Sequence, residues 1–505
     1  MRGKKTLINT LMNLVLQIVT IISGFVLPRL ILEKFGSQYN GLIASITQFL
    51  ACAVLLRSGI GGATRAALYK PLADKNKDEI NSIMKATDIF MKKIGFILAG
   101  LIIIFSVIYP FLVQNEFSWI FSFSLFLIIG ISTFAESFFG ITYLILLQAD
   151  QKLWVESLFR IISTILNVIL SVILIYCNFS IHIVKLGSAL AFCIYPILLN
   201  IYVRKKYKLN LKVEPNKKAI NQRWDAFWHQ VATFVNNNTD VMVLTIFTNM
   251  LEVSVYSVYN MIVSTLKNIV FAFSNGLEAA FGNMIAKGEK NALKENLSII
   301  EFVIYNIATI VYICAILLIL QFVQVYTKGI NDVDYLRPQF AYILLVAQFF
   351  YCIRIPYQMV IQAAGHYKQT RNGAIMEALI NIIISVALVI KFGLIGVAVG
   401  TLASMIFRTI QLSIYMCKNI VERSNWITIY KCCIAFLEGI IIIFIVKILN
   451  LEMPATYIEW IKNGIITGII SLIIITIGSV IFYKNDTKRL LLKLKNMVKK
   501  KGIQV

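Results

Sequence analysis

Apolar runs of about 20 residues recur along the whole sequence, which is the length an α-helix needs to cross roughly 30 Å of hydrocarbon. With 58% hydrophobic and 14% charged residues and a mean hydropathy of +0.77, the composition is that of a membrane protein. We predict an all-α polytopic membrane protein with about fourteen transmembrane helices. The predicted spans are residues 6–32, 41–65, 94–113, 118–147, 154–176, 183–203, 226–247, 252–286, 298–323, 338–364, 373–390, 394–416, 432–449 and 461–483.

An internal repeat divides these spans into two sets. The stretch from Tyr143 to Val172 returns 214 residues later, and a second match at an offset of 217 places Tyr39 on Tyr256 and Gly59 on Gly276. The residues identical at the first offset are Tyr143 and Tyr357, Gln148 and Gln362, Ala149 and Ala363, Asn167 and Asn381, Ser171 and Ser385, and Val172 and Val386. Because each copy holds six spans, an even number, both copies enter the membrane from the same side. The repeat therefore predicts two six-helix lobes related by a parallel pseudo-two-fold axis.

The repeat also predicts the domain organisation. Two spans beyond the repeat have no counterpart, and Gly464 and Gly468 in the last span predict a face for close helix packing. The predicted parts are an N-lobe at 1–205, a basic cytoplasmic linker at 206–225, a C-lobe at 226–417, two extra spans within 418–483, and a basic cytoplasmic tail at 484–505.

Positive charge is placed unevenly along the chain. The net charge is +23 with 48 Lys and Arg residues, and the loops expected on the outer side hold only Lys34, Lys328, Arg337 and Lys391. This asymmetry follows the positive-inside rule, so we expect a multi-pass cell-membrane protein with both termini cytoplasmic. The basic blocks are read as topology determinants that also touch anionic lipid headgroups, not as nucleic-acid sites.

The connecting loops exclude several classes of function. The longest outer connection, about 324–337, has no pair of carboxylates beyond Asp332 and Asp334, which is too little for a membrane enzyme acting on lipid-linked sugars. No phosphate-binding GxxxxGK[ST] loop is present. The three histidines are far apart in the sequence, which makes a metal site improbable. We therefore expect no enzyme and no cofactor.

Four cations lie about 15 residues from the outer ends of their predicted spans: Arg57, Lys267, Arg354 and Arg408. Ionisable groups in hydrocarbon cost several kcal/mol unless they face a polar interior or a partner, which makes each a candidate site residue. Arg354 precedes Pro356, which is expected to kink its helix. Two readings stay open: the cations converge on a substrate cavity, or they pair with carboxylates that lock the helix bundle.

The deep acidic residues are Glu136 and Asp240, whereas Glu156, Glu301 and Glu377 lie closer to the cytoplasmic ends of their spans. A buried carboxylate can exchange a proton during transport, or it can stay ionised beside a cation as a structural pair. Glu136 and Asp240 are therefore candidates for coupling to an ion such as H⁺ or Na⁺.

Three further charged residues are expected near the ends of their spans. Glu156 and Arg160 stand at i and i+4 and predict a local ion pair. Lys185 is expected to reach the outer headgroups.

Several stretches together resemble the polysaccharide exporter family, the O-antigen and capsule repeat-unit flippases of the multidrug/oligosaccharidyl-lipid/polysaccharide exporter superfamily. They are PRLILEKFGSQYNGL at 28–42, SGIGGATRAALYKPLADKNKDEI at 58–80, and the two Gln-Ala steps at 148 and 362. The resemblance covers essentially the whole chain.

The resemblance implies a secondary-active flippase that works by alternating access. Its cargo would be an undecaprenyl-pyrophosphate-linked oligosaccharide, moved from the inner to the outer leaflet for cell-surface polysaccharide biosynthesis. The four cations would bind the pyrophosphate, and the polysaccharide polymerase machinery would be a partner.

Alternative functions remain. Lipid II flippases share this plan, but the cations of their first span are replaced here by Asn13 and Gln17. A cation-coupled multidrug exporter of the same superfamily is a second alternative, and a membrane scaffold with no transport cycle is a third.

Overall fold

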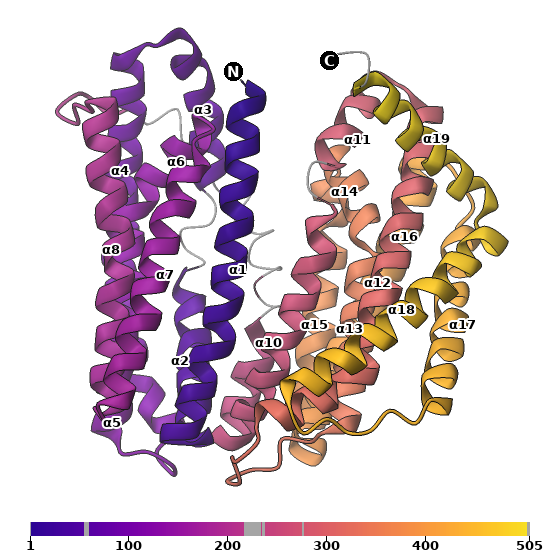
Figure 1. Ribbon diagram of the computed structural model, residues 1–505. Helices are drawn as coiled ribbons and strands as arrows, with labels where there is room; N and C mark the ends of the chain where they lie inside the picture. Colours follow the sequence, from indigo (N-terminus) through magenta and orange to yellow (C-terminus); the bar gives the residue numbers. More distant parts are fainter. Residues whose placement is uncertain (1, 55–59, 217–233, 235–237, 275–276, 502–505) are drawn as a thin grey trace. The chain divides into compact units, whose positions relative to one another are not determined.

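The computed structural model describes residues 2–54, 60–216, 234, 238–274 and 277–501. The regular elements of these residues are helices (Figure 1). The chain divides into two compact units, each described by itself below. Unit 1 comprises Met1–Ser257 with Ile330–Val333, and unit 2 comprises Val258–Gly329 with Asp334–Val505.

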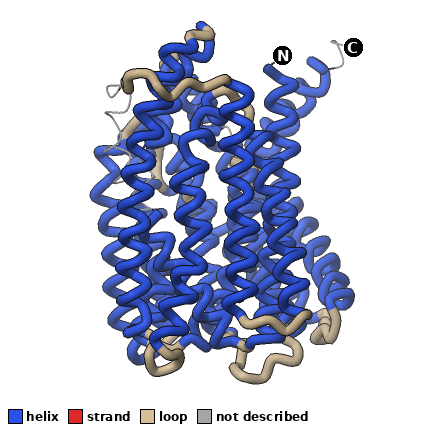
Figure 2. The backbone as a smooth tube through the Cα atoms, turned by 90° about the vertical axis from the view of Figure 1, so that its left-hand side faces the viewer, coloured by secondary structure: helices blue, strands red, loops and turns tan. Residues whose placement is uncertain are grey.

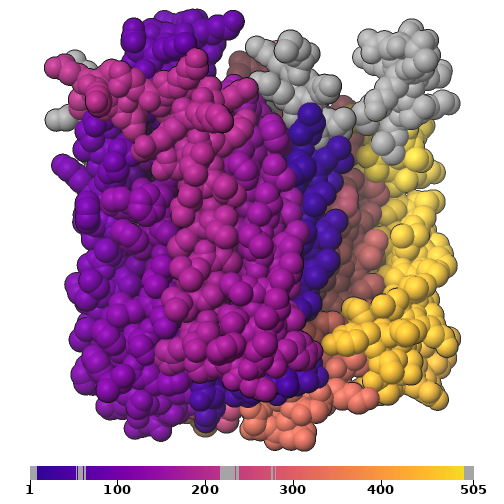
Figure 3. Space-filling model, turned by 60° about the vertical axis from the view of Figure 1, so that its left-hand side comes forward, coloured from indigo at the N-terminus to yellow at the C-terminus, as the bar shows by residue number. Residues whose placement is uncertain are grey.

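Unit 1 is built from long helices that run side by side with their loops at the ends (Figure 2). Helix α1 packs along α7, and its residues form a narrow band beside the surface of α7 and α8 (Figure 3). The elements are α1 (Arg2–Phe35), α2 (Ser37–Val54), α3 (Ile60–Asp74), α4 (Lys77–Leu112), α5 (Trp119–Ala135), the π-helix η2 (Glu136–Gly140), α6 (Ile141–Ala149), α7 (Leu153–Tyr176), α8 (Ile181–Tyr207), a short helix Asn238–Phe247, and the start of α10 (Met250–Ala272).

Unit 2 holds the rest of α10 and the remaining helices. Its closest helix pair is α15 and α16, and α12 packs against α13, α17 and α18. The elements are α11 (Leu277–Ala286), α12 (Lys290–Tyr326), α13 (Pro338–Ile353), α14 (Ile355–Ala363), α15 (Tyr367–Phe392), α16 (Leu394–Met416), the π-helix η4 (Cys417–Val421), α17 (Trp426–Ile448), α18 (Tyr457–Phe482) and α19 (Lys484–Lys501).

The predicted membrane architecture agrees with these helices. Eleven helices of the described residues are long and apolar enough to cross a membrane, and they coincide with eleven of the fourteen predicted spans. The other three predictions fall on α2, on Asn238–Phe247 and on α10 with α11, and parts of all three lie outside the described residues. The predicted all-α polytopic fold is confirmed.

Helix boundaries repeat at the offset found in the sequence. Helices α6 and α14 each have nine residues and begin at Ile141 and Ile355, 214 positions apart. The following helices, α7 and α15, begin at Leu153 and Tyr367, again 214 positions apart. The repeated element is a broken span followed by a tight turn and a long helix. It occurs once in unit 1 and once in unit 2.

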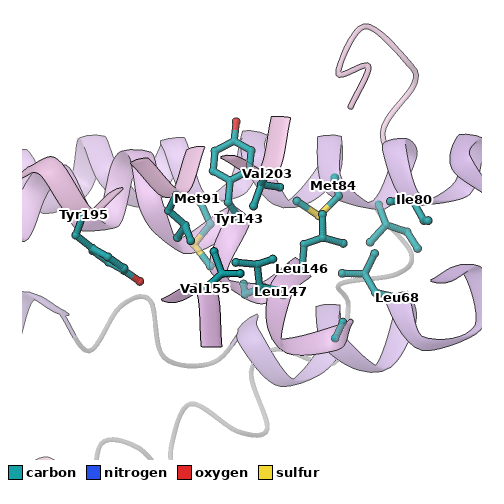
Figure 4. Packing of buried hydrophobic residues seen from close by; sticks show 14 of the residues in the cluster. Leu68, Ile80, Met84, Met91, Tyr143, Leu146, Leu147, Val155, Tyr195 and Val203 are labelled. Atoms are coloured by element: carbon teal, nitrogen blue, oxygen red, sulfur yellow. The ribbon is translucent and has the colours of Figure 1, made fainter. Parts of the chain in front are cut away.

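One apolar cluster of unit 1 surrounds the first copy of this element. Tyr143, Leu146 and Leu147 of α6 pack against Met84 of α4 and Val203 of α8 (Figure 4). Burying side chains of this size contributes about 1.5–3 kcal/mol each in water. In the plane of a membrane the same contacts act through close packing. This cluster fixes α6 and so fixes the break that precedes it.

The close packing predicted at the last span lies elsewhere along it. A Cβ at Gly468 would meet nothing within 4 Å among the described residues, and one at Gly464 would meet only the Leu318 side chain at 3.7 Å. The close approach is at Gly478, where a Cβ would lie 2.0 Å from Glu438 Oε1 of α17. The spacing of small residues predicted that the last span packs closely against a neighbour, but it did not predict that Gly478 makes the close contact.

The division into units differs from the predicted lobe boundary. The units separate inside α10, between Ser257 and Val258, whereas the predicted linker at 206–225 lies outside the described residues from position 217 onward. The predicted domain boundaries stay predictions.

Candidate functional site

Two predicted cations of unit 2 share one carboxylate. Arg354 stands at the break between α13 and α14, and its Nη1 donates to Glu377 Oε1 of α15 at 2.6 Å. Arg408 of α16 places Nε 3.3 Å from the other oxygen of the same carboxylate. All three residues are buried, with 5%, 7% and 2% of Arg354, Arg408 and Glu377 exposed. Glu377 was not predicted to lie with the cations.

A third predicted cation lies beside the first. The Arg354 Cζ atom lies 4.5 Å from the ring centroid of Tyr351, and Lys267 Nζ of α10 lies 5.0 Å from the same centroid. An aromatic face attracts a cation through its quadrupole. Tyr351 therefore holds Lys267 and Arg354 in one neighbourhood although α10 and α13 are far apart in the sequence.

One nitrogen of the two arginines has no hydrogen-bond partner among the described residues. Arg408 Nη1 donates to Thr370 O at 3.1 Å and to Gln411 Oε1 at 2.8 Å. The Nε of Arg354 is buried and has no hydrogen-bond partner among the described residues. Two guanidinium groups against one carboxylate leave one positive charge uncompensated within this triad. The triad therefore carries a net positive charge.

Arg57, the fourth predicted cation, lies outside the described residues. The predicted convergence of all four cations on one cavity is therefore untested. Lys267, Arg354 and Arg408 do lie in one neighbourhood of unit 2. Arg354 and Arg408 each pair with a carboxylate, that of Glu377, as the second of the two interpretations expected.

Glu136, a candidate coupling residue, lies in unit 1 in a small charged cluster. Arg160 Nε lies 3.0 Å from Glu156 Oε1, which confirms the predicted i, i+4 pair, and Arg160 Nη2 lies 2.9 Å from Glu136 Oε1. Glu136 is the first residue of the π-helix η2. A π-helical turn interrupts the regular ladder and is frequent at functional sites. The sequence contains no local signal for the turn.

A cavity of about 630 Å³ opens beside this cluster. Its lining comes from α1, α5, η2, α7 and α8 and includes Glu136, Glu156, Arg160 and Tyr195. The Tyr195 ring covers the guanidinium, with Arg160 Cζ 4.5 Å from its centroid. Tyr195 lies at one end of the apolar cluster of unit 1 (Figure 4).

A second cavity of about 350 Å³ adjoins the first, because Ser132, Thr133 and Phe192 line both. Lys185 of α8 lines this second cavity with Thr47 of α2. Its position around the helix axis turns Lys185 toward α2 and α5, which hydropathy along the sequence does not reveal. That Lys185 reaches the outer headgroups stays a prediction.

Asp240, the other candidate coupling residue, also lies in unit 1. It belongs to the short helix Asn238–Phe247, is 5% exposed, and accepts a hydrogen bond at 2.8 Å from the Tyr256 hydroxyl. The structure does not bring Asp240 together with Glu136 in one cluster of described contacts. The two candidates are separate sites in unit 1.

Comparison with known proteins identifies solved structures with a similar fold. No family model matches the sequence, and no curated protein matches it. Among solved structures, the chain is similar to lipid II flippase MurJ in an inward closed conformation, with a TM-score of 0.74, 17% identity, and coverage of 95% of this chain and 99% of that chain.

A multidrug resistance MATE family transporter of the MOP superfamily, in an inward-facing conformation, matches with a TM-score of 0.63 and 13% identity over 79% of this chain and 95% of that one. The Vibrio cholerae MATE transporter VcmN in the bent form matches with a TM-score of 0.57 and 11% identity over 82% and 97%. This chain has their fold. With that fold and its apolar helices, it is a multi-pass membrane protein.

Proposed function

We propose that the protein is a secondary-active flippase for a polyprenyl-pyrophosphate-linked oligosaccharide repeat unit. It would move this cargo from the inner to the outer leaflet by alternating access, for cell-surface polysaccharide biosynthesis. The fold supports the general class, since the proteins that share it are named a flippase and multidrug transporters. The direction of movement is the one that the resemblance to the polysaccharide exporter family implies.

The observation that carries the proposal is the triad of Arg354, Glu377 and Arg408. A buried carboxylate between two guanidinium groups holds both side chains in place, and one positive charge remains for a ligand. A guanidinium fork binds phosphate oxygens through two parallel charge-assisted hydrogen bonds. A pyrophosphate headgroup fits this chemistry, while its polyprenyl chain can stay in the lipid. Lys267 beside Tyr351 extends the positive surface.

The same triad argues against a cationic drug as the main cargo, because like charges repel strongly where water is scarce. A lipid II-type cargo is the second candidate, favoured by the match to MurJ over 95% of this chain. Deleting the gene distinguishes the two candidates. Loss of a repeat-unit flippase causes a lipid-linked repeat unit to accumulate inside the cell, whereas loss of a lipid II flippase causes the peptidoglycan precursor to accumulate.

Coupling would run through Asp240 or Glu136 with H⁺ or Na⁺ as the ion. Asp240 is buried and accepts a hydrogen bond from the Tyr256 hydroxyl, and a buried carboxylate is suited to a change of protonation state.

The decisive test measures flipping of a fluorescent lipid-linked oligosaccharide in proteoliposomes. Each charge-assisted hydrogen bond to phosphate contributes about 1.5–3 kcal/mol, so Arg354→Ala should lower the rate at least about tenfold. Arg354→Lys should restore part of it, because Lys keeps the charge and loses the planar fork. Lys391→Ala, at the end of α15, serves as the matched control. Full flipping by Arg354→Ala and Lys267→Ala in normally folded protein would overturn the cationic site.

A further inference from the structure

Two adjoining cavities of unit 1 share three lining residues, Ser132, Thr133 and Phe192, and are together named here the unit 1 cavity. Their volumes, about 630 and 350 Å³, fall in the range of sites that enclose small organic ligands, roughly 300–1,000 Å³. The function proposed above places the pyrophosphate in unit 2 and gives this space no role beyond coupling at Glu136.

The lining of the unit 1 cavity is hydroxyl-rich. Eight Ser and Thr side chains line it from five helices, α1, α2, α5, α7 and α8: Thr20, Ser23, Thr47, Ser132, Thr133, Ser163, Thr164 and Ser188. Hydroxyls both donate and accept hydrogen bonds. Such a lining can bind a ligand that carries hydroxyl groups of its own, beside apolar residues of the same lining such as Leu16, Leu50 and Ile129.

Three charged groups on the lining add directional acceptors and a donor. Glu136 and Glu156 hold Arg160 between them, so that both carboxylates are fixed in orientation at 2.9 and 3.0 Å from its nitrogens. Oriented carboxylates and guanidinium groups form hydrogen bonds with neutral hydroxyls that are stronger than those between neutral groups. Phe192 and Tyr195 supply flat apolar faces in the same space.

One buried hydroxyl on the lining has no hydrogen-bond partner among the described residues. Tyr195 is only 4% exposed, and its hydroxyl makes no hydrogen bond with any described residue. A buried hydroxyl without a partner is costly. A ligand in the cavity that offers a hydroxyl or a ring oxygen would satisfy it.

Lys185 indicates that a ligand of this cavity carries a negative charge. It lines the second cavity among Thr47, Ser132, Thr133 and Ser188, and it makes no ion pair with any described residue. An ammonium group in such a place can form an ion pair with an anionic group of a bound ligand.

We propose that the unit 1 cavity binds the saccharide part of the cargo and takes a sugar residue that bears a carboxylate. This inference rests on the proposed function, and it names the substrate class. The carboxylate binds Lys185, and the sugar hydroxyls bind the Glu136, Arg160 and Glu156 cluster and the Tyr195 hydroxyl.

The test uses purified full-length protein and two soluble sugars, glucuronate and glucose, which share a pyranose ring and differ at the carboxylate. Calorimetric titration should show glucuronate binding at least about tenfold tighter than glucose, the effect of one charge-assisted contact. Lys185→Met should abolish the difference and leave glucose binding unchanged, and Lys185→Arg should retain it. Tyr195→Phe should weaken both sugars about fivefold, the effect of one neutral hydrogen bond.

Lys93→Met, a change at an exposed lysine of α4, is the control and should bind as the wild type does. Equal affinities for the two sugars, or a preference for glucuronate that survives Lys185→Met, would overturn the acidic-sugar assignment. Absence of binding by both sugars would overturn the site itself.

A flipping assay on the same preparation separates this result from the proposed function. If a lipid-linked oligosaccharide is moved and neither sugar binds, the saccharide site is wrong and the flippase stands. If glucuronate binds in a Lys185-dependent way and no lipid-linked saccharide is moved, the flippase proposal fails.

Discussion

Arg354 and Glu377 form a buried ion pair of 2.6 Å between the break in a membrane span and the middle of the next long helix. They are 23 positions apart, so neither belongs to a local helical pair. The break at Arg354 is fixed by α14, whose nine residues and starting position repeat those of α6 in unit 1. The repeated element thus places a cation in unit 2 where unit 1 has Gly140.

Glu377→Gln should destabilise the protein, because it leaves two buried guanidinium groups without a carboxylate. Breaking a buried pair by removing one partner costs about 3–5 kcal/mol, which thermal unfolding in detergent would record as a clear fall in Tm. Glu295→Gln is the control, since its side chain is 57% exposed and its partner Arg489 lies 3.5 Å away. An unchanged Tm for Glu377→Gln would contradict the structural part of the triad.

Glu438→Leu should stabilise the protein. Glu438 of α17 is 3% exposed, and its Oε1 has no hydrogen-bond partner among the described residues. An unsatisfied buried polar group costs about 1–3 kcal/mol, and Leu removes it with little change in volume. The measurement is the midpoint of thermal unfolding, and a lower Tm in the variant would show that Glu438 has a partner.

Glu301→Leu is the opposite case and a matched comparison. Glu301 of α12 is fully buried and pairs with Arg423 and with Lys431, the latter at 2.8 Å. Its loss would leave two cations without a carboxylate and should cost about 3–5 kcal/mol. The two Glu→Leu changes should therefore move Tm in opposite directions.

Gly478→Ala should destabilise the contact between α17 and α18, because its Cβ would lie 2.0 Å from Glu438 Oε1. Forcing atoms into a packed site typically costs about 1–3 kcal/mol. Combined with Glu438→Ala, the same change should cost much less, since the clashing atom is gone. A double-mutant cycle on unfolding free energies measures this coupling, and additive effects would place the strain elsewhere.

Asp240→Asn should insert and fold normally yet lose the dependence of flipping on the pH gradient. An amide keeps an oxygen that accepts from the Tyr256 hydroxyl and cannot take up a proton. Flipping in proteoliposomes with and without an imposed gradient tests this. Transport that still responds to the gradient would remove Asp240 from the coupling mechanism, and Glu136→Gln is the next variant to measure.

Both termini and the 206–225 linker should be accessible from the cytoplasm. Single cysteines replacing Lys212 and Lys495 in a cysteine-free background should react with a membrane-impermeant maleimide only after the cells are opened. Labelling of either position in intact cells would reverse the predicted topology.

The spans were predictable from the sequence by itself, because the thickness of the bilayer sets a minimum length for each apolar helix. The repeat was predictable for a different reason, because residues such as Tyr143 and Tyr357 are identical at one offset. The boundaries of α6 and α14 follow that offset. Contacts within a single helix were predictable as well. The i, i+4 pair of Glu156 and Arg160 follows from helical periodicity alone.

The tertiary structure determines which side chains of different helices are in contact. Whether Arg354 meets Glu377, whether Glu136 joins Arg160, and whether Lys185 turns to a cavity all depend on how each helix is rotated about its axis. In spans that are apolar nearly all round, the hydrophobic pattern does not specify that rotation. Close packing against neighbouring helices does, as at Gly478 and Glu438, and packing of that kind exists only once the chain has folded.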